Sequence, residues 1–235
     1  MFINIFKLHR LKENVTRFLS VTNYYNNYFR SLQAPSNRIM NITAPDKSLI
    51  GLTELNLSNN PIQEWSDVIQ LSKVLPNLTS LSLNECLISK IKFPNNGIAN
   101  WFPSLSMLQL SSCKIDNWES IEALNAITSL VHFKFKNNPI LEKENKDTCR
   151  QLIIAAIGSI KYLNGSIVEK QERRGAEIDF LKKYGKEYLS LQGSGVSTEM
   201  EKFVATHPRY DLWLRFKLSS RTVQHFLTKQ FYMTY

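Results

Sequence analysis

LTELNLSNNPI, residues 52–62, carries leucine at its first, fourth and sixth positions, asparagine at the ninth and isoleucine at the eleventh. The same eleven-residue frame recurs as LTSLSLNECLI from Leu78, LSMLQLSSCKI from Leu105 and LVHFKFKNNPI from Leu130. Frames that start at residues 52, 78, 105 and 130 lie 26, 27 and 25 residues apart. A chance amphipathic strand would not recur in register, so the segment is one unit of a repeating structure.

This spacing is typical of a leucine-rich repeat, in which each unit supplies one short strand and a return segment. We therefore predict an α/β leucine-rich-repeat solenoid: a curved parallel sheet, helices and loops on its convex side, and a helical C-terminal cap. Side chains alternate between the two faces of a strand. The residues predicted to point inward are Leu55, Leu57, Leu81, Leu83, Leu108, Leu110, Phe133 and Phe135.

The ninth position of the frame is where the chain turns away from the strand. It holds Asn60, Cys86, Cys113 and Asn138. A buried asparagine can bond the bare backbone groups of such a turn, and a small cysteine can be tolerated beside them. We therefore predict that Cys86 and Cys113 are interior residues of the repeats rather than metal ligands or disulfide partners.

The composition is that of a folded protein. The chain has 235 residues, 43% of them hydrophobic, which is enough for one or two domains with a core. Three cysteines without a C-x-x-C spacing indicate a reducing compartment. No run reaches the roughly 18 apolar residues that span a bilayer, so no membrane is expected. The net charge of +9 suggests an acidic partner or simply a solvated surface.

The chain divides into four predicted parts. Residues 1–44 lack glycine and do not fit the frame, although Leu8, Leu11 and Val15 have near-helical spacing. Three interpretations of this segment remain open: a helix capping the solenoid, a mitochondrial presequence or membrane-surface helix, and a divergent, poorly ordered start. The others are four repeats over 45–140, a cap and charged helix over 141–190, and a linker and tail over 191–235.

The return segments differ from one another. Helices are expected after the first and third frames, because Trp65 to Leu75 and Trp118 to Ile127 have apolar residues on one helical face. Pro94, Gly97 and Pro103 predict an irregular second connection.

The predicted cap begins after the last frame. It consists of a helix over 146–157, a strand over 160–163, a tight turn at Asn164 and Gly165, and a charged helix. By composition, QGSGVST at 192–198 is a linker.

No catalytic, cofactor or metal site is predicted, and no small-molecule substrate. The sequence has no nucleophile elbow and no cluster with metal-ligand spacing. His207, in THPRY, has no carboxylate partner at a recognisable spacing. We expect it to be a turn residue held by Pro208, with Arg209 and Tyr210 packed on the cap. The protein is accordingly predicted not to be an enzyme.

The concave face of the sheet is the predicted binding surface, as in many repeat proteins. Its outward-pointing residues are Glu54, Asn56, Ser58, Ser80, Ser82, Asn84, Met107, Gln109, Ser111, His132, Lys134 and Lys136. The cap adds Arg173, Arg174, Lys182 and Lys183. We expect this basic C-terminal end to meet an acidic partner, the alternative being that Lys134 and Lys136 only keep the strand soluble.

Four segments occur in order, and several of them lie outside the leucine pattern: ISKIKFPNNGI, LIIAAIGSIKYLN, ERRGAEIDFLKKYG and HPRY. Together they resemble the tubulin-specific chaperone E family, also called tubulin-folding cofactor E. The resemblance implies a non-enzymatic protein of the cytoplasm and cytoskeleton. Such a protein acts after the chaperonin to assemble αβ-tubulin dimers and can also take them apart. Its implied partners are α-tubulin and other tubulin-folding cofactors.

The family also carries a CAP-Gly domain and a ubiquitin-like domain. The first glycine here is Gly51, and few residues follow LWLRFK. We therefore expect only the central repeat region of the family, and whether it functions without the flanking domains stays open.

Two other functions remain as alternatives. An RNA-splicing scaffold is favoured by the basic charge. Nucleic acid is nevertheless not expected as a partner, because the predicted concave face has no aromatic side chains on which bases could stack. A generic repeat adaptor for a phosphatase or dynein motor is permitted by the cap, although ERRGAEIDF and HPRY do not favour it.

Overall fold

The computed structural model describes residues 30–43, 48–94, 100–194 and 197–207. Seven strands form one sheet in the order of the chain. They are β1 (Ser31–Gln33), β2 (Glu54–Asn56), β3 (Ser80–Ser82), β4 (Met107–Gln109), β5 (His132–Lys134), β6 (Tyr162–Leu163) and β7 (Ser166–Ile167). Neighbouring strands from β1 to β6 are parallel, and β7 is antiparallel to β6. This is the predicted leucine-rich-repeat solenoid.

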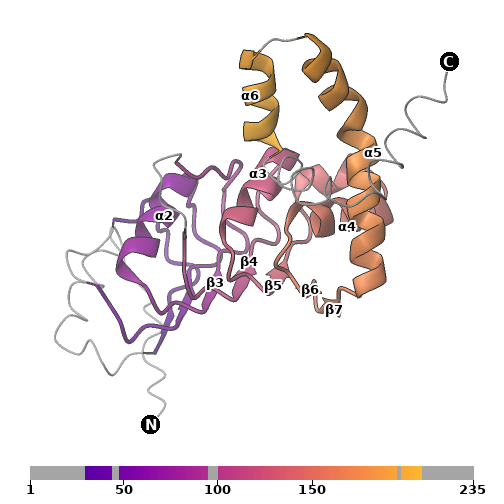
Figure 1. Cartoon of the computed structure of the whole chain (residues 1–235). Coiled ribbons are helices and arrows are strands. Elements are labelled where there is room, and N and C mark those ends of the chain that lie inside the picture. The colour runs from indigo at the N-terminus through magenta and orange to yellow at the C-terminus, as the bar shows by residue number, and fades with distance from the viewer. Residues whose placement is uncertain (1–29, 44–47, 95–99, 195–196, 208–235) are drawn as a thin grey trace.

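The described helices are α2 (Trp65–Val74), α3 (Trp118–Ala123), α4 (Lys146–Ala156), α5 (Lys170–Ser194) and α6 (Ser197–Thr206), with 3-10 turns η2 (Leu124–Ala126) and η3 (Pro139–Glu142). Helices α2, α3 and α4 lie on the other side of the core from the sheet, and α5 runs along the C-terminal end of the solenoid (Figure 1). In the described parts of the second connection, 89–94 and 100–104, no helix forms. Phe93 instead packs between Trp65 and Trp101, with ring centroids 5.9 Å apart on each side.

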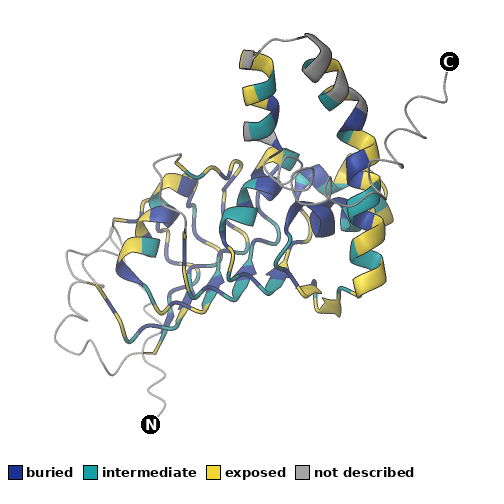
Figure 2. Cartoon of the chain, viewed as in Figure 1, coloured by how far each residue is buried: buried dark blue, intermediate teal, exposed yellow. Residues whose placement is uncertain are grey.

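The repeat frame sets the register of the sheet. Leu55 lies opposite Leu81, Leu81 opposite Leu108, and Leu108 opposite Phe133. All eight residues predicted to point inward are between 0% and 2% exposed. Figure 2 shows the resulting alternation of buried and accessible residues along the strands. The leucine pattern therefore builds a single continuous core.

The ninth position is also buried as predicted. The side-chain oxygen of Asn60 accepts hydrogen bonds from the backbone N–H groups of Asn37 and Ile39, at 2.9 and 3.0 Å. Its amide nitrogen donates hydrogen bonds to the carbonyls of Ala34 and Leu57, at 2.9 and 2.8 Å. One asparagine side chain thus satisfies four backbone groups that have no place in the sheet.

Cysteines fill this position with fewer bonds. The thiol of Cys86 donates to the Leu57 carbonyl at 3.5 Å, and that of Cys113 to the Leu83 carbonyl at 3.2 Å. Both cysteines are free, as expected for interior residues of the repeats.

One prediction about the start of the solenoid is wrong. Residues 1–44 were predicted to lie outside the repeat frame, yet β1 within this segment pairs in parallel with β2, Leu32 lying opposite Leu55. Leu32, Ala34, Asn37 and Ile39 occupy the fourth, sixth, ninth and eleventh positions of an earlier frame, and all are buried. The helix expected before this strand lies outside the described residues.

The turn after each strand uses the same backbone conformation in five successive repeats. The eighth position has a positive φ of 52° to 59° at Ser36, Asn59, Glu85, Ser112 and Asn137. None of these residues is glycine, so the stacking of neighbouring turns compensates the cost of the left-handed conformation.

The cap follows the predicted order of helix, strand and tight turn. Asn164 and Gly165 have φ of 55° and 89° and join β6 to β7. The region predicted as linker and tail is more regular than expected, because α5 continues to Ser194 and α6 begins at Ser197. No described helix is both long enough and apolar enough to cross a membrane.

Candidate protein-interaction surface

The predicted concave residues all lie on the face of the sheet turned away from the core. Each strand from β2 to β5 buries its central residue and leaves both flanking residues accessible. Hydrogen bonds run across the middle of this face. Asn56 donates to Gln33 of β1 at 2.9 Å, and Asn84 donates to Gln109 of β4 at 3.3 Å. Much of the polar capacity of these rows is therefore used within the protein.

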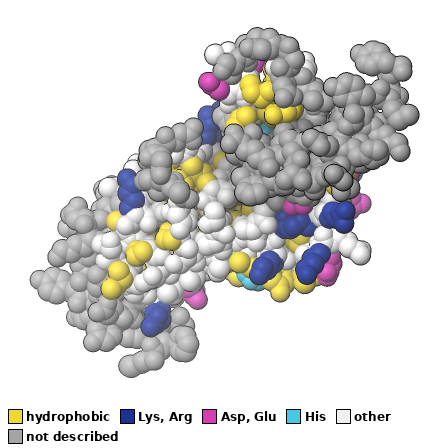
Figure 3. Space-filling model, viewed as in Figure 1, with side chains coloured by type: hydrophobic (Ala, Val, Ile, Leu, Met, Phe, Trp, Pro, Cys, Tyr) yellow, Lys and Arg dark blue, Asp and Glu magenta, His cyan; other side chains and the backbone are white. Residues whose placement is uncertain are grey.

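The β5 end of the face differs. The side chains of Lys134 and Lys136 are exposed, and within the described residues neither has a hydrogen-bond or ion-pair partner. The ring of His132 stacks on that of Tyr162 from β6, with centroids 4.4 Å apart and planes 4° apart. Figure 3 shows Lys and Arg side chains gathered toward this C-terminal end of the solenoid.

Tyr162 was not among the predicted binding residues. It is 36% exposed and pairs directly with His132 across the sheet. Extending the frame to the strand predicted in the cap would have placed it beside His132. The expectation that the concave face has no aromatic residue is therefore wrong.

The cap residues proposed for binding are largely committed to the cap itself. Arg173 donates to the carbonyls of Ile154 and Ile157 at 2.9 and 3.3 Å, and also to that of Ile160. It thereby satisfies carbonyls at the end of α4 and in the turn that follows. Its neighbour Arg174 is exposed.

The two lysines of this set lie on α5, which packs on α4. Lys182 pairs with Asp179 at 3.4 Å and Lys183 with Glu144 at 3.8 Å. The structure thus groups Lys134 and Lys136 with His132 and not with the cap lysines.

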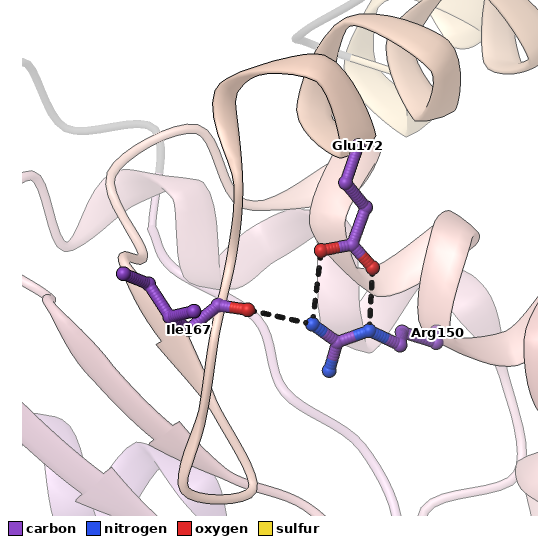
Figure 4. Close-up of polar contacts among 3 residues, drawn as sticks. All are labelled: Arg150, Ile167 and Glu172. Atoms are coloured by element: carbon purple, nitrogen blue, oxygen red, sulfur yellow. Dashed lines mark hydrogen bonds and ion pairs between the residues drawn. The ribbon is translucent and has the colours of Figure 1, made fainter.

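The start of α5 is fixed by a second arginine (Figure 4). Arg150 of α4 contacts both carboxylate oxygens of Glu172, at 2.6 and 3.0 Å, and donates to the Ile167 carbonyl at 3.0 Å. The hydrogen bond from Arg150 holds the pKa of Glu172 below its ordinary value. One side chain therefore joins α4, β7 and α5.

A buried acid and imidazole join the convex face to the end of α6. His207 Nδ1 lies 2.9 Å from each carboxylate oxygen of Glu122 in α3, and the two residues are 8% and 1% exposed. Rings of Tyr184 and Phe203 lie 4.1 and 4.9 Å from the imidazole. Burial raises the pKa of Glu122, and the hydrogen bond to His207 opposes that shift.

This pair corrects the predicted role of His207. His207 directly follows the last residue of α6 and is the partner of a carboxylate 85 positions away, where no carboxylate partner was expected. Pro208, Arg209 and Tyr210 lie outside the described residues. The pair is enclosed by aromatic rings, and no group of three or more possible metal ligands occurs in the described parts of the chain.

Comparison with curated proteins gives relatives named tubulin-specific chaperone E and others named tubulin-specific chaperone cofactor E-like protein. Tubulin-specific chaperone E of Danio rerio is 36% identical over 189 residues, which is 76% of this chain and 35% of the relative. The Bos taurus protein of that name is 34% identical over 215 residues, 86% of this chain and 40% of the relative. The chain therefore spans little more than a third of the length of these relatives. No protein-family model matches it.

A solved structure supports the fold. A chain of the Drosophila melanogaster SNF/U2A′ complex superposes with a TM-score of 0.50 at 20% identity, covering 68% of this chain and 86% of that one. At this identity the likeness concerns the architecture alone.

Proposed function

We propose that this chain, which corresponds to a partial region of tubulin-specific chaperone E, is a non-enzymatic tubulin-folding cofactor of the cytoplasm and cytoskeleton. It acts after the chaperonin, in the assembly of αβ-tubulin dimers and in their dissociation. The observation that carries the proposal is the match to these relatives at 34% and 36% identity, over 86% and 76% of this chain.

The concave face is the proposed contact surface for α-tubulin. It is an extended, accessible surface on a continuous core, so a partner can bind without reorganising the repeats. The outward residues from Glu54 to Lys136 form this surface, while exposed cap residues such as Arg174 contribute at its margin. Other tubulin-folding cofactors are proposed to bind the same chain while tubulin occupies this face.

Size-exclusion chromatography of the full chain mixed with αβ-tubulin, at low and at high salt, tests the proposal. We expect a complex that elutes earlier than either component and weakens at high salt, because exposed charges are screened. A chain that elutes alone at both salt concentrations would contradict tubulin binding.

A second candidate is binding of single-stranded RNA. The stacked His132 and Tyr162 rings beside Lys134 and Lys136 favour it, because RNA-binding surfaces combine aromatic platforms with basic side chains. The test is addition of an RNA oligonucleotide to the same chromatography. RNA that co-elutes and displaces tubulin would favour this candidate.

A further inference from the structure

Three accessible side chains alternate with buried ones along β5 and just beyond its end. They are His132 and Lys134 of β5 and Lys136 two residues after it, with Phe133 and Phe135 buried between them. Alternate residues of an extended chain are about 6.8 Å apart. The three accessible residues therefore follow one another on the same face, and Tyr162 from β6 widens the row at the His132 end.

This row is chemically distinct from its neighbours on the concave face. Asn56 and Asn84 each donate to a glutamine on an adjacent strand. Lys134 and Lys136 have no such side-chain partner within the described residues. Positive charge without a partner thus concentrates on one strand, and its natural complement is a negatively charged group.

We infer that β5 and β6 bind an extended acidic segment of a partner protein. The segment lies along β5 with two carboxylate side chains, two residues apart, opposite Lys134 and Lys136. A large apolar side chain two residues before the first carboxylate packs against the His132–Tyr162 pair. The inference rests on the proposed function only for the identity of the partner, tubulin, whose acidic surface would supply the segment.

Geometry is the reason for an extended segment. Side chains on one side of an extended peptide repeat every two residues, at the same spacing of about 6.8 Å as the row on β5. Adjacent acidic residues would point to opposite sides and could engage only one lysine. The row therefore favours an alternating pattern: an apolar residue, any residue, an acid, any residue and an acid.

A polypeptide fits this row better than RNA. Tyr162 and His132 stack face to face, so each ring already has one face covered by the other. Together they form one short platform, whereas single-stranded nucleic acid is usually held by aromatic side chains that stack successive bases. RNA is nevertheless the competing outcome that the experiment must separate.

Fluorescence anisotropy with two labelled synthetic peptides tests the inference on the full chain. The probe carries Leu-Ser-Glu-Ser-Glu between flexible Gly-Ser ends, and the control carries Leu-Ser-Ser-Glu-Glu with the same composition. We expect the probe to bind at low salt at least about fivefold more tightly than the control. Equal affinities of the two peptides would overturn the extended geometry.

The variant Lys134→Glu/Lys136→Glu should bind the probe at least about tenfold more weakly, and Tyr162→Ala about threefold more weakly. The matched control is Lys73→Glu/Lys90→Glu, which reverses two exposed lysines outside the concave face. Probe binding that falls equally in both double variants would overturn the site, because only net charge would matter. A uridine oligonucleotide that displaces the probe and is itself lost in Lys134→Glu/Lys136→Glu would overturn the acidic-peptide assignment in favour of RNA.

Tubulin added to the same variants separates this inference from the proposed function. Tubulin that binds the wild-type chain and Lys134→Glu/Lys136→Glu equally would overturn the inference and leave the function standing. Probe binding with the expected pattern, but no tubulin complex, would support the acidic site and contradict the proposed function.

Discussion

The repeats from β1 to β5 and the cap from α4 to α6 are stabilised in different ways. In the repeats one set of contacts recurs: an inward apolar pair, a bonded ninth position and a left-handed eighth residue. In the cap each contact occurs once, through Arg150, Arg173 or the pair of Glu122 and His207. Repetition spreads these contacts over many equivalent residues, whereas the cap adds single charged side chains to its part of the shared apolar core.

The largest expected effect comes from breaking the repeated core. Leu108→Ala, at a position that is 0% exposed in the middle of the sheet, should lower the free energy of unfolding by about 3 kcal/mol through the cavity it leaves. Urea denaturation measures this loss. Ser82→Ala, on the accessible face of β3, serves as control and should cost less than about 0.5 kcal/mol. Similar losses in the two variants would contradict the assigned direction of the strands.

The ninth position can sharpen the comparison within the repeats. Asn60→Ala removes the partner of four backbone groups and should cost about 2 kcal/mol. Cys86→Ala removes only one weak sulfur contact and a small volume, so we expect a loss of about 1 kcal/mol or less. Urea midpoints of the two variants measure the difference. A larger loss at Cys86 would show that packing, and not backbone bonding, governs this position.

The stability of the cap should depend on Arg173 but not on its neighbour Arg174. Arg173→Ala leaves three carbonyl acceptors without their donor and should lower stability by about 1 to 2 kcal/mol. Arg174→Ala removes an exposed side chain and should change stability by less than about 0.5 kcal/mol. Hydrogen exchange in α4 and α5 measures where the loss occurs. Equal exchange in the two variants would contradict the structural role of Arg173.

The smallest effect should be a pH-dependent loosening of α6. Burial raises the pKa of Glu122 above its ordinary value of 4.5, so above that pH the unfolded chain releases a proton that the folded chain retains. The contribution of this carboxyl to folding stability is therefore fully present below pH 4.5, and it is lost as the pH rises through the raised pKa of the folded chain. Each unit of elevation corresponds to about 1.4 kcal/mol.

Hydrogen-exchange protection of α6, corrected for the intrinsic pH dependence of exchange, measures this loosening. In Glu122→Gln the carboxamide cannot titrate but can still accept a hydrogen bond from His207. We therefore expect a decline in α6 protection with pH for the wild-type chain and a flatter profile for Glu122→Gln. A profile unchanged by the substitution would assign the effect to another group.

The same contrast explains what could be predicted from the sequence. The strands β2 to β5 and their inward residues follow from a period, because every repeat places the same residue types at the same positions. The first repeat was missed because Ala34 replaces the usual leucine and only 23 residues separate Leu32 from Leu55. A departure in both composition and spacing weakens the period at the end of the stack.

Contacts of the cap have no period to reveal them. His207 and Glu122 lie 85 positions apart, and nothing in either local sequence indicates the other. Arg173 and Arg174 are adjacent and chemically identical, so the sequence cannot tell the half-buried donor from the exposed residue. Tyr162 lies between these cases, because the frame extended into the cap places it beside His132.

The three free cysteines turn this division into something that can be observed directly. Burial raises the pKa of Cys86 to about 11 and of Cys113 to about 12, and also raises that of Cys149. A thiol reacts as its thiolate, so alkylating reagents should scarcely modify the folded chain at neutral pH. Cys86 and Cys113 belong to the repeats and Cys149 to the cap. The order in which the three become alkylated therefore records which half of the molecule opens first, without any cysteine being introduced by mutation.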